Sequence, residues 1–231
     1  MRKKISVAMA TYNGEKYIKE QLETILVQLH DGDEIVISDD GSIDNTMDII
    51  KSFNDDRIKI ISGPKLGVKK NFENAIKNCK GEYIFLADQD DIWLSGKVEL
   101  CLEQLEKEFL LIVHDAYIVD SNLESIEESF FKYRGSKKGV IKNILKNSYI
   151  GCCMAFDKKM IPEILPIPDN VEMHDQWIGI LANYKGKVKF LQKQLIKYRR
   201  HSDNTSSFKH YPLRRMIKNR MILIKEFLKR I

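Results

Sequence analysis

The sequence ISVAMATYNG at residues 5–14 is the stretch that decides the fold. Residues 5–10 are apolar or small, and a polar turn follows them at once. Beyond the turn, side chains recur at the spacing of one helical face: Tyr17, Gln21, Leu22, Ile25 and Leu29. A short buried strand, a turn and an amphipathic helix are therefore predicted here.

The same unit repeats along the first half of the chain. Strands are predicted at 34–38, 58–61, 82–87 and 110–119, and helices after Asp44, at 68–79 and at 97–107. This alternation predicts an α/β fold with a mostly parallel sheet flanked by helices. The second half is less regular, and we expect a loop and a basic helix at 121–150, a strand at 151–156, a helix at 175–184 and one or two strands at 188–199.

Length and charge predict the domain organisation. With 231 residues, of which 43% are hydrophobic, the chain can bury one sizeable core. Residues 1–184 hold 23 cations and 31 anions, whereas residues 185–231 hold 15 cations and 2 anions. We therefore expect one domain at 1–206 and a basic amphipathic helix at 207–231.

Several common classes of protein are disfavoured. The four cysteines form no C-x-x-C pair, so buried, reduced thiols are expected. The chain has neither a G-x-x-x-x-G-K-[ST] loop nor a G-x-G-x-x-G turn after a strand, which argues against a P-loop ATPase and a dinucleotide dehydrogenase. Its apolar runs are too short for a signal peptide or a membrane span, so we expect a cytoplasmic protein.

Polar clusters follow three of the predicted strands: Thr11-Tyr12-Asn13, Asp39-Asp40 and Asp88-Gln89-Asp90. Ligands of open α/β sheets bind beyond the carboxyl ends of the strands, so these clusters should converge on one crevice. Crowded carboxylates are unfavourable unless a cation offsets them. A hard divalent cation, Mg²⁺ or Mn²⁺, together with a diphosphate ligand, is the predicted partner.

The ordered set of motifs resembles the family-2 glycosyltransferases, which share the GT-A fold. The resemblance covers roughly residues 4–206 and rests on these segments: VAMATYN at 7–13, SDDGS at 38–42 with Asp44 and Thr46, GVKKN at 67–71, FLADQDDIW at 85–93, HDQW at 174–177 and YRRHSDN at 198–204. The DQDDIW form at 88–93 and the HDQW form at 174–177 are similar to those of the branch that builds bacterial surface polysaccharides, including rhamnosyltransferase-like members. The resemblance implies a metal-assisted, inverting enzyme.

The resemblance also implies roles for individual residues. Thr11, Tyr12 and Asn13 would line the base pocket, and Asp39 would accept a hydrogen bond from the pyrimidine N3–H. Lys70 and Asn71 would face the nucleotide. Asp88 would lie near the ribose and the metal, and Asp90 would bind the metal directly. His201 would lie at the metal or the diphosphate, with Arg199 and Arg200 close by. The alternatives are turn capping for Asp39 and Asp40, ordinary exposed helix positions for Lys70 and Asn71, and an ordinary loop position for His201.

Asp175 is the expected catalytic base, and its alternative role is a plain helix N-cap. It would take the proton from an acceptor hydroxyl as that oxygen attacks the anomeric carbon, opposite the departing nucleoside diphosphate. UDP-hexose and dTDP-rhamnose are the candidate donors, and a glycan or a polyprenyl-linked glycan is the candidate acceptor. Asp91 is expected to cap the next turn and Trp93 to belong to the core.

The basic tail from Pro212 onward has the pattern of an amphipathic helix. Its apolar face is predicted to hold Leu213, Met216, Ile217, Met221, Ile224, Phe227, Leu228 and Ile231, with lysines and arginines opposite. Such a helix can lie on an anionic membrane surface, here the inner face of the cell membrane. Packing against the domain or a homodimer seam is the open alternative.

Two rival functions remain at this point. A non-catalytic nucleotide-sugar or glycan-binding module would keep the fold, but Asp90 and Asp175 are both present and favour catalysis. A nucleotidyltransferase would show a glycine-rich, basic loop after the first strand, which residues 11–15 do not provide. Nucleic-acid binding is not expected, because an apolar stripe accompanies the basic charge of the tail.

Overall fold

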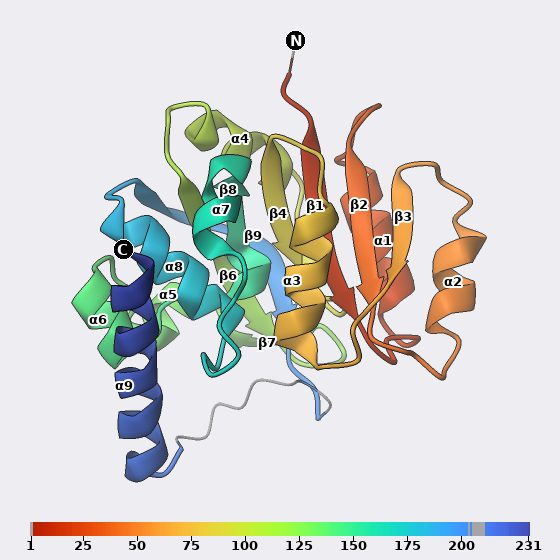
Figure 1. The fold of residues 1–231 in the computed structure, drawn as a ribbon. Helices are drawn as coiled ribbons and strands as arrows, with labels where there is room; N and C mark the ends of the chain where they lie inside the picture. The colour runs from red at the N-terminus through yellow and green to blue at the C-terminus, as the bar shows by residue number, and fades with distance from the viewer. Residues whose placement is uncertain (1, 203, 205–210) are drawn as a thin grey trace.

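A central mixed sheet with helices on both faces organises the computed structural model, which describes residues 2–202, 204 and 211–231 (Figure 1). Its strands follow the order β3-β2-β1-β4-β8-β6-β9-β5, and β7 pairs with β6 outside this path. In that order their bounds are Ile58–Ser62, Glu34–Asp39, Ile5–Thr11, Tyr83–Ala87, Met154–Asp157, Leu111–Val119, Val188–Arg199 and Ile92–Trp93, with β7 at Ser125–Glu127.

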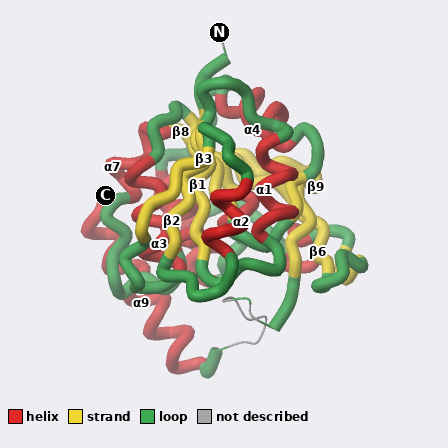
Figure 2. Tube along the Cα trace, turned by 90° about the vertical axis from the view of Figure 1, so that its right-hand side faces the viewer, coloured by secondary structure: helices red, strands yellow, loops and turns green. Residues whose placement is uncertain are grey.

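The helices cover the sheet from two sides. Figure 2 shows the strands running between α3 and α7 on one side and α1 and α4 on the other. The helices described are α1 (Ile18–Leu26), α2 (Thr46–Ser52), α3 (Val68–Asn78), α4 (Lys97–Leu105), α5 (Phe130–Arg134), α6 (Val140–Leu145), α7 (Ile161–Ile164), α8 (His174–Tyr184) and α9 (Leu213–Arg230), with short 3-10 turns at Gly151–Cys153 and Lys158–Met160.

The parallel half of the sheet aligns the strand ends that matter for the site. β1 and β4 are buried along their whole length, as expected of strands covered on both faces. Thr11 lies opposite Asp39 in the β1–β2 ladder, and Asp39 lies opposite Ser62 in the β2–β3 ladder. Three strands therefore finish level with one another, and their following turns share one edge.

The second half of the sheet is mixed, which refines the expectation of a mostly parallel sheet. β8 is antiparallel to both neighbours, β4 and β6, while β6 and β9 are parallel. β8 has four residues, all buried, so its sequence carries no periodicity from which its direction could be predicted. The region 121–150 holds β7, α5 and α6 in place of the expected loop and single basic helix.

Helix α9 packs on the domain through Phe227, which belongs to the predicted apolar face, and through Leu223, which does not. Leu223 and Phe227 are buried, and the Phe227 ring lies edge-on to Tyr184 with centroids 5.5 Å apart. The Arg230 guanidinium donates to backbone carbonyls at Glu163, Leu165 and Pro166. The predicted apolar face is thus divided, because Phe227 is buried while Leu213, Ile217, Met221, Ile224, Leu228 and Ile231 are exposed.

Candidate active site

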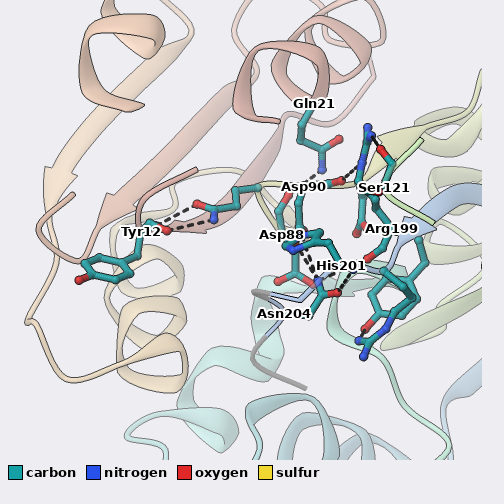
Figure 3. Close-up of polar contacts among 12 residues, drawn as sticks. Tyr12, Gln21, Asp88, Asp90, Ser121, Arg199, His201 and Asn204 are labelled. Carbon is teal, nitrogen blue, oxygen red and sulfur yellow. Dashed lines mark hydrogen bonds and ion pairs between the residues drawn. The ribbon is translucent and has the colours of Figure 1, made fainter. Parts of the chain in front are cut away.

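The acidic segment Asp88-Gln-Asp-Asp91 comes directly after β4, at the carboxyl ends of the parallel strands. The buried Gln21 of α1 donates its amide to the Asp88 carbonyl at 2.7 Å (Figure 3). Gln89 Oε1 accepts from the Thr11 hydroxyl and from the Tyr12 amide, and Gln89 Nε2 donates to the Tyr12 carbonyl. The acidic segment is therefore fixed to both α1 and the end of β1.

The turn after β1 contributes one accessible side chain. Tyr12 is 54% exposed, and its ring is directed away from the acidic cluster in Figure 3. Asn13 adopts a left-handed backbone conformation with φ of 50°, and its Oδ1 accepts from the Ile43 amide. Of the three residues predicted to line a base pocket, Tyr12 therefore offers an open ring, while Thr11 and Asn13 bond other parts of the protein.

Asp39 and Asp40 organise the turns after β2 and β3. The Asp39 carboxylate accepts from the Gly41 and Ser42 amides and from the Ser42 hydroxyl. Asp40 accepts from the amides of Lys65 and Gly67, which lead into α3. Both acids do cap turns. Because a carboxylate has about four acceptor positions, Asp39 keeps one for the ligand contact predicted above.

Lys70 and Asn71 of α3 make protein contacts in the structure. The Lys70 ammonium lies 2.9 Å from Glu73 and 2.8 Å from Asp169. The buried Asn71 amide donates to the carbonyls of Thr11 and Ser38, and so joins the ends of β1 and β2. Asn71 therefore shapes the crevice from behind, and its predicted contact with the nucleotide stays a prediction.

Arg199, at the end of β9, is almost fully engaged by the acidic segment and its surroundings. Its guanidinium donates to the Asp90 carbonyl, to the Ser121 carbonyl and to Glu20 Oε2, and its backbone amide donates to Asp91 Oδ1 at 3.0 Å (Figure 3). Asp91 therefore accepts a bond from β9 and does not cap the local turn, which corrects the expectation for that residue. Arg199 is 4% exposed, so it acts first as a positioning residue.

Replacing Arg199 by lysine is expected to lower the free energy of unfolding by about 3 kcal/mol, since an ammonium cannot reproduce the three-way fork and leaves buried acceptors unpaired. Chemical denaturation measures this change. Arg200→Lys is the matched control, because it makes the same substitution at the next residue, whose guanidinium bonds the Tyr198 hydroxyl. A variant with unchanged stability that fails to bind donor would contradict the positioning role and support the predicted donor contact.

Two residues from the segment after β9, His201 and Asn204, contact the Asp90 carboxylate. His201 Nε2 lies 2.8 Å and Asn204 Nδ2 lies 3.0 Å from Asp90 Oδ2 (Figure 3). The His201 ring stacks on Tyr17 of the turn before α1, with centroids 4.7 Å apart. The structure therefore brings together the two residues predicted as metal ligands from distant parts of the sequence. Asp203, which stands between His201 and Asn204 in the sequence, lies outside the described residues.

The carboxylates of this cluster oppose one another's ionisation. Burial and then the neighbouring Asp91, Asp90 and Asp175 raise the pKa of Asp88 well above its usual range. Burial and the charge of Asp90 raise the pKa of Asp91 to about 7. Asp91 Oδ2 is buried and accepts no hydrogen bond from the described residues. Uncompensated negative charge of this kind fits a bound cation.

The donor set suits a hard divalent ion. Carboxylate oxygens of Asp88 and Asp90 with the His201 imidazole match the preferences of Mg²⁺ and Mn²⁺. Ligand atoms of Asp88, Asp91 and Cys152 also lie within 4.8 Å of one another. Burial raises the pKa of the Cys152 thiol well above its usual range, so it stays protonated and contributes no hard ligand.

Asp175 lies in the first turn of α8, and its charge is among those that raise the pKa of Asp88. Helix α8 begins at His174, whose ring stacks on Phe72 of α3 with centroids 4.3 Å apart. Met173 is the N-cap residue, and Asp175 Oδ1 accepts from the next amide at 2.5 Å, so the alternative role as N-cap is wrong. Burial raises the pKa of Asp175 to about 6, and bonds from Gln176 and Asn147 oppose the rise.

Some residues of the site were not predicted. Gln21 holds Asp88, Gln89 holds the β1 turn, Glu20 pairs with Arg199, and Asn204 bonds Asp90. Gln21 carried a signal, because it is a polar residue on the apolar face of the first predicted helix. Glu20 lies at a position that the sequence pattern leaves exposed, and Gln89 and Asn204 lie inside motifs. The partners of all three are distant in the sequence.

The chain belongs to the family-2 glycosyltransferases. The model of glycosyl transferase family 2 matches residues 6–165, which contain β1, β2, β4 and the acidic segment. Members of this family commonly use a divalent metal ion. The chain therefore has the GT-A fold of this family.

Particular relatives agree with this assignment. An uncharacterized glycosyltransferase of Nostoc is 29% identical over 213 residues, covering 87% of this chain and 66% of the relative. The Escherichia coli UDP-Glc:alpha-D-GlcNAc-diphosphoundecaprenol beta-1,3-glucosyltransferase WfgD is 27% identical over 216 residues, which cover 91% of this chain and 83% of the relative. The crystal structure of Staphylococcus aureus TarS 1-349 in complex with UDP-GlcNAc superposes with a TM-score of 0.77 at 19% identity, covering 97% of this chain and 66% of that one.

Proposed function

We propose that this glycosyltransferase moves a sugar from a nucleoside-diphosphate sugar to a hydroxyl of a glycan or polyprenyl-linked acceptor, with inversion at the anomeric carbon and with Mn²⁺ or Mg²⁺. The observation that carries the proposal is the contact between Asp90 and His201, the two metal ligands predicted from distant parts of the sequence, whose Oδ2 and Nε2 atoms lie 2.8 Å apart next to Asp88 at the strand ends. Relatives named for UDP-glucose and UDP-GlcNAc favour a UDP-hexose over dTDP-rhamnose as donor.

The residues divide the work as follows. The Tyr12 ring and the Asp39 turn would bind the base of the nucleotide. Lys70, Asn71 and Arg200 would line the rest of the nucleotide site. Asp88, Asp90 and His201 would hold the metal ion, which when bound supplies positive charge against the leaving diphosphate. Asp175, ionised, accepts the proton of the acceptor hydroxyl. Arg199 keeps the acidic segment in place through the contacts described above.

The test is a donor panel with purified protein. UDP-glucose, UDP-GlcNAc and dTDP-rhamnose are offered with Mn²⁺, Mg²⁺ or EDTA, and nucleotide release is measured with and without a lipid-linked saccharide acceptor. We expect metal-dependent release from a UDP-hexose that the acceptor stimulates. Tight nucleotide-sugar binding without release under any of these conditions would favour a non-catalytic binding module of the same fold.

A further inference from the structure

Helix α9 presents three different faces. At 100° per residue, its six exposed apolar side chains fall within an arc of about 80°. These residues, here called the α9 apolar row, are Leu213, Ile217, Met221, Ile224, Leu228 and Ile231, and each exposes between 40% and 68% of its surface. The buried Leu223 and Phe227 lie on a separate face that holds the helix on the domain.

A band of cations borders the α9 apolar row. Arg214, Lys218, Lys225 and Lys229 occupy the adjoining arc of about 60° and are all exposed. Among them Lys229 pairs with Glu226, whereas no ion pair to a described residue is recorded for the other three. The first turns of α9 extend beyond the rest of the molecule in Figures 1 and 2, so this part of the helix is open to a large partner.

Helix α6 extends the same kind of surface. It packs against α9, and Arg220 of α9 donates to the Leu145 carbonyl of α6. Ile141 is 75% exposed and Leu145 is 56% exposed. The exposed cations of this segment are Lys137, Lys138, Lys142 and Lys146. Two neighbouring helices thus combine exposed apolar side chains with a surplus of positive charge.

We propose that α6 and α9 together form a docking surface for an anionic lipid bilayer. Apolar side chains would enter the boundary between headgroups and acyl chains, while the flanking lysines and arginines would lie against lipid phosphates. Charge complementarity selects this occupant over a second copy of the chain, because two such helices side by side would bring their cations together. Among the described residues of the structure, no helix is long and apolar enough to cross a membrane.

The docking surface lies next to the acceptor side of the site. α6 leads directly into Asn147, whose amide nitrogen lies 3.5 Å from Asp175 Oδ1. A bilayer against α6 and α9 would therefore be close to the base that receives the acceptor hydroxyl. This part of the inference rests on the proposed function, and it favours a lipid-linked acceptor over a soluble glycan.

Vesicle co-sedimentation tests the docking surface directly. Wild-type protein is expected to bind vesicles of phosphatidylcholine mixed with phosphatidylglycerol, to bind phosphatidylcholine alone at least about tenfold more weakly, and to be released by salt. Lys218→Glu/Lys225→Glu and Ile217→Asn/Met221→Asn should each lower binding to the anionic vesicles by at least about tenfold. Lys51→Glu/Lys77→Glu and Val27→Asn/Ile126→Asn change exposed residues elsewhere and should bind like wild type.

Release of nucleotide from the donor in the absence of vesicles separates the two proposals. The four variants should release nucleotide at the wild-type rate, because none of these residues belongs to the site. Vesicle binding without any donor turnover would overturn the proposed function and leave the docking surface standing. Donor turnover with no preference for anionic vesicles, or a dimer that the Ile217→Asn/Met221→Asn variant dissociates in sedimentation analysis, would overturn the docking proposal.

Discussion

Asp175→Asn is expected to lower kcat by about 10³-fold while leaving the affinity for UDP within about twofold of wild type. Loss of a general base typically costs 10²–10⁴-fold, and an amide of the same size cannot accept the proton from the acceptor. Single-turnover transfer and calorimetric titration with UDP measure the two quantities. Gln176→Glu is an informative control, because it changes the neighbouring residue without removing the carboxylate.

The pH dependence of wild type follows from the same carboxyl group. Because burial raises the pKa of Asp175 to about 6, the carboxyl is protonated below that pH and cannot act as a base. We therefore expect kcat/KM to fall as the pH drops through about 6, and we expect the small residual rate of Asp175→Asn to lack that inflection. An unchanged inflection in the variant would assign the ionisation to another group and remove Asp175 from the role of base.

The raised pKa also predicts an effect on stability with a definite sign. The folded protein holds the Asp175 proton more tightly than the unfolded chain does, so ionisation opposes folding. The cost is absent below the ordinary pKa of 3.8 and complete above about 6, where it is on the order of 3 kcal/mol. Asp175→Asn should therefore gain thermal stability relative to wild type as the pH rises across this range.

The second large effect is expected for Asp90→Ala. Removing this carboxylate takes away the acceptor that His201 and Asn204 share and one of the proposed ligands of the metal ion. Metal-dependent turnover should fall by at least about 10²-fold, as for the loss of a single strong electrostatic contact in a site. The affinity for Mn²⁺ in the presence of UDP, measured by electron paramagnetic resonance, should fall in parallel.

Asp56→Ala provides the matched control for Asp90→Ala, because Asp56 is an exposed acid before β3. It should keep both turnover and Mn²⁺ affinity. If Asp90→Ala loses turnover but binds Mn²⁺ as tightly as wild type, Asp90 is not a metal ligand. The geometry would then assign it to holding His201 and Asn204.

Much of the site could be predicted because it depends on local pattern. Thr11, Asp39 and Asp88 each follow an apolar run at the end of a strand, and parallel strands finish at the same edge. Trp93 was expected in the core, and it is 3% exposed. These features depend on a few consecutive residues, whose spacing is visible in the sequence.

The rest depends on contacts between distant segments. The partner of Asp91 is a backbone amide 108 residues away, and nothing near Asp91 in the sequence points to it. The antiparallel direction of β8 depends on how the chain returns between β4 and β6. Both the docked and the exposed face of α9 carry apolar side chains, and the burial of Leu223 and Phe227 shows which of the two packs on the domain.

The position of Arg199 has a consequence for synthesis of the protein on the ribosome. The acidic segment at 88–91 emerges early, but the arginine that binds it is more than 100 residues further along the chain. A nascent chain that has released only the first five strands therefore lacks the guanidinium that bonds the Asp90 carbonyl and the backbone amide that bonds Asp91. The contacts that hold the acidic segment are completed only when β9 enters the sheet, after more than 100 further residues have been translated.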